Sequence, residues 1–258
     1  MTSETFRKIR ILILLLVLFF VALQTWLTQM RSTDWQQPLW VVVYPINGDG
    51  SRVTEQYINS LEEQTFDDIE DFFISEAQHY SLAVHDPVTV KMAPQVTSQP
   101  PMPPQGSNMF DVIAWSLKMR YWAWKHNNYS GPTPDIQMYV KYYDPAENRR
   151  LGHSLGLKKG MVGVVNAFAA SKYTGSNNVV IAHELLHTVG ASDKYDPASN
   201  QPVYPAGFAE PERKPLYPQR KAELMAGRIP ITQNKALTPK SLRSVVIGEA
   251  TAVEILWK

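Results

Sequence analysis

The segment VVIAHELLHTVGASDKYD, residues 179–196, restricts the local fold more than any other part of the chain. His183 and His187 are four residues apart in an otherwise apolar run, which is the spacing of side chains on one face of an α-helix. The asparagines at 177–178 are residues that cap helices, and Gly190 can adopt the left-handed conformation that ends one. The segment therefore predicts a helix that presents both imidazoles together and ends at Gly190.

These residues have the chemistry of a metal site. Two neutral imidazoles supply two ligands of a catalytic zinc ion, and Glu184 lies one step round the helix, where it can act as a base towards a water. A catalytic zinc ion needs a third protein ligand, and Asp193 is the first side chain able to return to the metal after the turn at Gly190. The chain has no cysteine, so only histidine and carboxylate are available. The sequence predicts Zn²⁺ bound by His183, His187 and Asp193.

The spacing HExxHxxGxxD over residues 183–193 resembles the zinc signature of the metzincin metallopeptidases, in the variant with aspartate as third ligand that snapalysin-like enzymes use. The resemblance implies a zinc-dependent peptidase that hydrolyses peptide bonds through an activated water, with Glu184 as general base. It also implies a methionine turn below the metal, for which AELMAGR supplies Met225. In that family a strand just before the active-site helix forms the cleft edge and binds extended substrate, and residues 160–170 occupy that place. The candidate substrate-binding residues there are Val165, Ala167, Phe168 and Ala169.

The third ligand has an alternative. Thermolysin-like enzymes take it from a glutamate on a downstream helix, which nominates Glu223 or, less readily, Glu210 in this chain. The segment around Glu223 is short and is ended by glycine, which favours Asp193. The sequence does not decide which of three tyrosines faces the metal: Tyr195, Tyr204 or Tyr217.

Two other functions are compatible with the same residues. One is a membrane-anchored binding or assembly protein that keeps the fold without catalysis, although an intact Glu184 argues against it. The other is a zinc hydrolase of a non-protein amide. The formal charge of +1 gives no field that would attract nucleic acid, so the expected partners are a peptide or protein substrate and the membrane.

The N-terminal region has the features of a membrane anchor. Residues 11–27 are almost without polar atoms, and the run approaches the roughly 20 residues that a bilayer-spanning helix needs. Arg7, Lys8 and Arg10 precede it, so the N-terminus should stay cytoplasmic. We expect a cytoplasmic tail at 1–10, a single transmembrane anchor at 11–30 and a domain at 31–258 on the exported side, in the periplasm or outside the cell. A cleaved signal peptide is the alternative, but the apolar run is long and lacks a small-residue cleavage site.

The remaining pattern predicts an α+β fold with a mixed, twisted sheet and long helices. Strands are expected at 38–46, 87–92, 136–143 and 161–168, and helices at 54–80, 108–126 and 239–247. The helix at 108–126 has two apolar stripes, which predicts burial on both sides, with an exposed aromatic surface as the alternative. The active-site helix should form the cleft floor, with an upper lobe to about residue 190 and a smaller Pro-rich C-terminal lobe from about 191.

Overall fold

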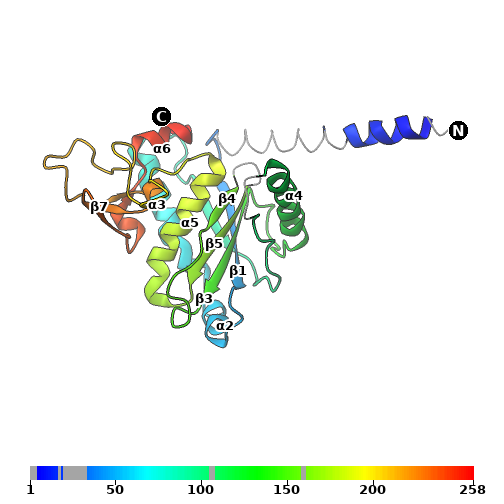
Figure 1. Cartoon of the computed structure of the whole chain (residues 1–258), viewed down its shortest axis with the longest axis horizontal. Helices are drawn as coiled ribbons and strands as arrows, with labels where there is room; N and C mark the ends of the chain where they lie inside the picture. Colours follow the sequence, from blue (N-terminus) through cyan, green and yellow to red (C-terminus); the bar gives the residue numbers. More distant parts are fainter. Residues whose placement is uncertain (1–4, 17–18, 20–33, 105–107, 158–160) are drawn as a thin grey trace.

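The computed structural model describes residues 5–16, 19, 34–104, 108–157 and 161–258 (Figure 1). Its centre is a five-stranded sheet with the strand order β2-β1-β3-β5-β4. Four strands run parallel, and the fifth, β4 (Leu155–Leu157), pairs antiparallel with β5 at one edge. The parallel strands are β1 (Leu39–Asn47), β2 (Val88–Met92), β3 (Ile136–Tyr143) and β5 (Val162–Phe168). The fold is mixed α/β with a mainly parallel sheet, consistent with the α+β expectation, and the four predicted strands are confirmed.

Helices cover both faces of this sheet. Along β1, Val41 and Val43 belong to a core shared with α3 (Asp67–His79) and α5 (Thr174–Val189). The alternate residues Val42, Tyr44 and Ile46 face α4 (Met109–Lys125) instead. Figure 1 shows α4 on the opposite flank of the sheet from α5. Burial on both faces explains why the parallel strands are continuously hydrophobic.

The predicted helix at 54–80 is wrong as a single element. The structure has α2 (Arg52–Asn59), a 3₁₀ turn η1 (Glu63–Phe66) and then α3. Leu61 is buried between the helices, and the side chains of Glu62 and Thr65 each bond the other's backbone. This reciprocal cap starts a new helical turn, although the apolar periodicity continues across the break.

The predicted helix at 239–247 is also wrong. That segment contains a 3₁₀ turn η4 (Leu242–Ser244) and a short strand β9 (Val245–Val246), and the helix α6 (Glu249–Glu254) begins later. The run of β-branched residues at 245–247 favours the strand, which pairs with β6 (Ala222–Glu223). The sequence pattern also missed the hairpin of β7 (Ile229–Thr232) and β8 (Lys235–Leu237).

The C-terminal part packs against the sheet through one continuous core. Met225, Leu242 and Trp257 belong to the same buried cluster as the inner residues of α3 and α5. Two side chains also bind the backbone of Ile247. Glu76 of α3 accepts from its N–H through Oε2 at 2.7 Å, and the hydroxyl of Tyr80, the residue after α3, donates to its carbonyl at 2.7 Å. Residues 34–190 and 191–258 are therefore joined by packing and by specific hydrogen bonds.

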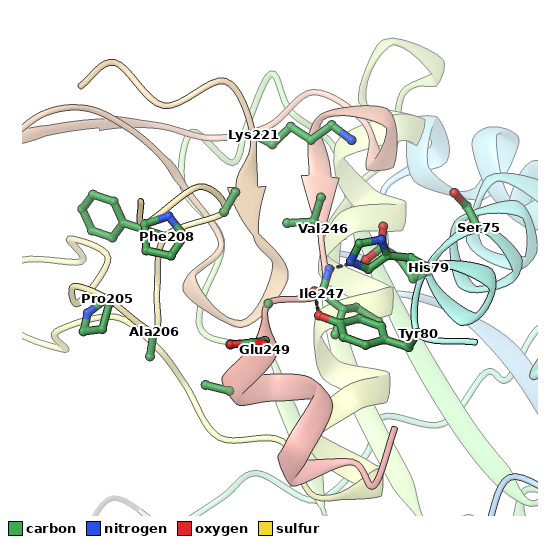
Figure 2. Close-up of a pocket in the computed structure, with 15 residues that line it drawn as sticks. Ser75, His79, Tyr80, Pro205, Ala206, Phe208, Lys221, Val246, Ile247 and Glu249 are labelled. Carbon is green, nitrogen blue, oxygen red and sulfur yellow. Dashed lines mark hydrogen bonds between the residues drawn. The ribbon is translucent and has the colours of Figure 1, made fainter. Parts of the chain in front are cut away.

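A cavity of 660 Å³ lies beside this contact. Figure 2 shows Pro205 and Phe208 on one side of it and His79 and Tyr80 on the other, with Ile247 bonded to Tyr80 between them. Neither zinc-ligand histidine predicted from the sequence lines this cavity.

Helix α4 differs from the expectation of burial on both sides. One stripe consists of Val112, Trp115, Met119 and Trp122, and all but Val112 are buried; the other stripe lies in solvent. The exposed residues of that stripe are Phe110, Ile113, Leu117, Tyr121 and Trp124.

The predicted anchor at 11–30 falls largely outside the described residues. Residues 5–16 are helical with exposed side chains. Within the part of the chain that the structure describes, no helix has both the length and the apolar character needed to cross a bilayer.

Candidate metal centre

The centre is built on α5, which is fixed at both ends. The helix begins at Thr174, so the predicted capping role of the asparagines at 177–178 is wrong. Asn177 instead bonds the backbone N–H and carbonyl of Phe168 at 3.1 and 2.9 Å, and Asn178 donates to the carbonyl of Thr65 at 2.8 Å. The two amides therefore attach the helix to β5 and to η1. Gly190 ends the helix with a φ of 117°, the left-handed conformation expected from the sequence.

The chain turns after Gly190 and brings Asp193 back to the two histidines. Asp193 Oδ1 lies 3.2 Å from His183 Nε2 and 3.2 Å from His187 Nε2. The three ligand atoms lie within 4.8 Å of one another, so together they could hold a metal ion. A tetrahedral zinc ion with bonds of about 2.0–2.1 Å separates its ligand atoms by about 3.3 Å. The donor atoms and their spacing therefore fit zinc.

Backbone carbonyls orient both rings. His183 Nδ1 is 2.9 Å from the carbonyl oxygen of Leu224, and His187 Nδ1 is 2.9 Å from that of Ala191. A carbonyl can only accept, so each Nδ1 carries a proton, and each Nε2 is the nitrogen directed at Asp193. Once its Nε2 gives up a proton, each ring is in the tautomer that binds a metal through Nε2, and such carbonyl partners fix ligand orientation at metal sites.

Asp193 is held as a carboxylate. Its burial opposes ionisation, but hydrogen bonds from His183 and His187 and their charges outweigh burial and lower the pKa of Asp193 well below its usual range. Tyr195 lies against it: burial and then the charge of Asp193 raise the pKa of the Tyr195 hydroxyl. Of the three candidate tyrosines, Tyr195 is thus the one placed at the centre, whereas Tyr204 and Tyr217 pack against Phe208.

Glu184 lies next to the ligands in a nearly dry position. Its side chain is buried, and among the described residues Oε2 has no hydrogen-bond partner. Burial raises the pKa of Glu184, with the nearby histidines opposing the rise. A carboxyl group with an uncommitted oxygen and a raised pKa has the properties of a general base.

The turn at Met225 lies directly against the histidines. Met225 is fully buried in the 3₁₀ turn η3 (Leu224–Ala226), and its carbonyl accepts from the backbone N–H of Lys194 at 2.9 Å. The carbonyl of the preceding residue, Leu224, binds the imidazole ring of His183. The turn therefore positions the side chain of one ligand and the backbone next to another, Asp193. The structure therefore places Met225 in a buried turn next to this centre.

The alternative third ligands are engaged elsewhere. Glu223 is fully buried and accepts hydrogen bonds from Ala226 N–H, Gly248 N–H and the Thr251 hydroxyl at 2.9, 3.2 and 2.7 Å. Glu210 pairs with Arg213 at 3.1 Å. The structure brings Asp193 to the histidines and leaves both glutamates out of the group.

The prediction that residues 160–170 form the open cleft edge is wrong. β5 is an inner strand, and β4 covers its first part. Further along, Asn166 N–H donates to Ser154 Oγ at 3.0 Å, and the backbone of Phe168 is bonded by Asn177. Three of the candidate substrate-binding residues are buried, namely Val165, Ala167 and Ala169. Phe168 lines a cavity of 350 Å³ that also borders His183 and Glu184.

The outer strand beside the metal centre is β4, which the sequence pattern missed. A Cβ atom added to Gly156 would lie 2.5 Å from the carbonyl oxygen of Glu184 and 2.5 Å from His187 Cβ. Glycine thus lets the strand approach α5 closely at the base and at one ligand. A glycine between two leucines was the available signal, but three residues without β-branching are too short for a strand pattern.

No protein-family model matches this chain and no curated protein matches it in sequence, so the proposals below depend on the geometry of this centre.

Proposed function

We propose that this chain is a zinc-dependent peptidase that hydrolyses peptide bonds with water as the nucleophile and Glu184 as the general base. One observation carries the proposal: Asp193 Oδ1 lies 3.2 Å from the Nε2 atoms of both His183 and His187, beside the buried carboxyl group of Glu184. Both distances are close to the roughly 3.3 Å that separates neighbouring ligand atoms around a tetrahedral zinc ion.

The residues divide the chemistry between them. A zinc ion held by His183, His187 and Asp193 would supply Lewis-acid polarisation of the substrate carbonyl and would make a water more acidic. Glu184 takes a proton from the attacking water and returns it to the leaving amine. The carbonyls of Leu224 and Ala191 keep both imidazoles in the ligand tautomer throughout.

The substrate is an extended peptide. β4 is the terminal strand in the order of the described sheet, so a peptide can add to its outer edge through backbone hydrogen bonds. Gly156 places that edge against Glu184 and His187, which aligns a scissile bond with the base. The cavity of 350 Å³ next to His183 can receive one substrate side chain.

The order of the structural elements along the chain supports a metzincin-like arrangement. A helix with two histidines ends at a left-handed glycine, an aspartate follows, and a buried methionine turn lies against the ligands. If the apolar segment at 11–27 anchors the chain, the basic residues before it place the metal centre on the exported side of the membrane.

The decisive experiment is Glu184→Gln in the full chain, purified in detergent. We expect hydrolysis of an unstructured protein to fall by about 10²–10⁴-fold, the usual contribution of a positioned acid or base, because glutamine cannot accept the proton. Zinc content, measured by elemental analysis, should be unchanged because Glu184 is not a ligand. Glu212→Gln, at an exposed glutamate, is the matched control and should leave both quantities unchanged.

Two outcomes would contradict the proposal. Hydrolysis that survives in Glu184→Gln would remove Glu184 from the mechanism. A wild-type chain that binds zinc and cleaves no peptide or protein would favour a non-catalytic binding protein or a hydrolase of another amide.

A further inference from the structure

Helix α4 leaves a long apolar face in solvent. Its inner residues are covered by the sheet: Met119 and Trp122 pack against Tyr139, whose hydroxyl donates to the carbonyl of Ala123. On the outer side, Phe110 is 80% exposed, Leu117 58% and Trp124 74%. The other large apolar residues exposed on this helix are Met109, Val112, Ile113 and Tyr121. A contiguous apolar surface of this kind on a folded protein marks a place of interaction.

The composition of this face is that of a helix lying at a membrane surface. The Tyr121 and Trp124 rings lie together, with centroids 5.9 Å apart, and both residue types favour the boundary between lipid tails and headgroups. Lys118 and Lys125 are exposed beside them, whereas Asp111 is the acidic residue of the helix. Long apolar side chains with flanking lysines suit a bilayer that contains anionic lipid.

The connection between the predicted anchor and the folded domain is short enough to hold the domain near a bilayer. The apolar run within the anchor predicted at 11–30 ends at Leu27. Trp35 is already fixed in the core, where its Nε1 donates to the carbonyl of Ile255 at 2.6 Å. The seven residues 28–34 between them can span at most about 25 Å. This short connection keeps the folded domain close to the bilayer, and α4, with 17 residues and a length of about 25 Å, can lie along its surface.

We propose that the outer face of α4, made of Met109, Phe110, Val112, Ile113, Leu117, Tyr121 and Trp124, rests on the surface of the lipid bilayer as a second membrane contact. This contact fixes the orientation of the catalytic domain. Because α5 covers the opposite face of the sheet, the metal centre then points away from the lipid and towards water-borne substrates (Figure 1). The proposal depends on the predicted anchor and does not depend on the peptidase activity.

The absence of cysteine makes the contact directly measurable. Single cysteines at Leu117 and Trp124 in the full chain would carry an environment-sensitive fluorophore, with matched labels at Val53 and Val253, which are 48% and 54% exposed on other helices. The chain would be reconstituted in vesicles of phosphatidylcholine and phosphatidylglycerol. We expect emission from positions 117 and 124 to shift to shorter wavelength and to be quenched by nitroxide lipids, and emission from the two control positions to stay at the value in water.

Two results would overturn the proposal. One is emission at 117 and 124 that remains as water-like as at 53 and 253. The other is a blue shift that nitroxide lipids do not quench and that weakens when the protein is diluted, since a second copy of the chain would then cover this face. Loss of hydrolysis has no bearing on either result, because positions 117 and 124 lie on α4, which packs on the opposite face of the sheet from α5 and Glu184.

Discussion

Asp193 is positioned by its neighbours rather than by its own side chain. The N–H of Lys194 binds the carbonyl of Met225, so the residue before it is fixed close to α5 with one carboxylate oxygen between two imidazoles. A carboxylate also offsets the charge of a dication more than a third imidazole would. Glu223, in contrast, is held by its own side chain, because three donors already bind its oxygens.

Asp193→Ala should therefore lower zinc affinity by more than about 100-fold, since even indirect ligand partners are worth about 10–100-fold. Glu223→Gln should leave zinc affinity nearly unchanged but lower the thermal midpoint of the metal-free protein, because the amide cannot accept from all three donors. Competition with a chelating dye and thermal unfolding measure the two effects. Loss of zinc in Glu223→Gln with retention in Asp193→Ala would contradict the ligand set.

The sequence could identify His183, Glu184 and His187 because helical spacing alone fixes their relative positions. It favoured Asp193 and kept Glu223 as the alternative, since the choice depends on a contact between Lys194 and Met225, which are far apart in the sequence. The role of Asn177 was misjudged for a similar reason. An asparagine before an apolar run resembles a helix cap, and only the packed structure shows it bound to Phe168.

At the scale of elements, β4 shows how a short strand can position a site. It pairs with β5 over three residues and has Gly156 at its centre, against the backbone of α5. Its neighbour Gly152 lies in open surroundings, where an added Cβ would meet only Asn166 Nδ2 at 3.8 Å. The same glycine-to-alanine change therefore meets close neighbours at Gly156 and almost none at Gly152, so the two variants can be compared directly.

Gly156→Ala should damage hydrolysis much more than Gly152→Ala. The new methyl group would overlap the Glu184 carbonyl and His187 Cβ, which belong to a rigid helix, so β4 must move outward at an overpacking cost of about 1–3 kcal/mol. Steady-state kinetics with a peptide substrate, together with zinc content, would measure this displacement. Hydrolysis by Gly156→Ala at the wild-type rate would show that β4 does not position the substrate or the base.

The elements that sequence patterns predicted well are those with a regular period and burial on both faces, such as β1 and β3. Helix α4 was located correctly, but its two apolar stripes are equivalent in the sequence. Only the packing of Trp122 on Tyr139 shows which stripe is covered and which faces outward. The break between α2 and α3 was missed because the apolar period continues through Leu61, which is buried without being helical.

At the scale of the whole molecule, the sheet region and the C-terminal part meet at buried carboxyl groups. Glu76 accepts from the N–H of Ile247 across this boundary. The Tyr80 hydroxyl donates to the carbonyl of Ile247 (Figure 2). Burial raises the pKa of Glu76 above its ordinary value of 4.5. The hydrogen bond from Ile247 N–H and the charges of His79 and Lys221 oppose the rise, and Glu223 adds to it. The attachment of the C-terminal part should therefore respond to pH.

The direction of the pH effect on stability follows from proton binding in the folded and unfolded states. Below about pH 4.5 the carboxyl group of Glu76 is protonated in both the folded and the unfolded chain, so its contribution to stability is complete there. As the pH rises through the higher pKa of the folded state, the unfolded chain loses its proton more readily, and this contribution to folding is lost. Glu76→Gln keeps the acceptor for Ile247 N–H without the charge, so its stability relative to wild type should grow between about pH 4.5 and neutrality. Thermal unfolding of the chelated protein in detergent would measure the difference, since each kcal/mol corresponds to about 2–4 °C in a domain of this size.

Glu147→Gln, at an exposed glutamate, should give a difference that does not vary with pH. A constant difference for Glu76→Gln across the same range would show that this carboxyl group does not couple the two parts of the molecule to pH.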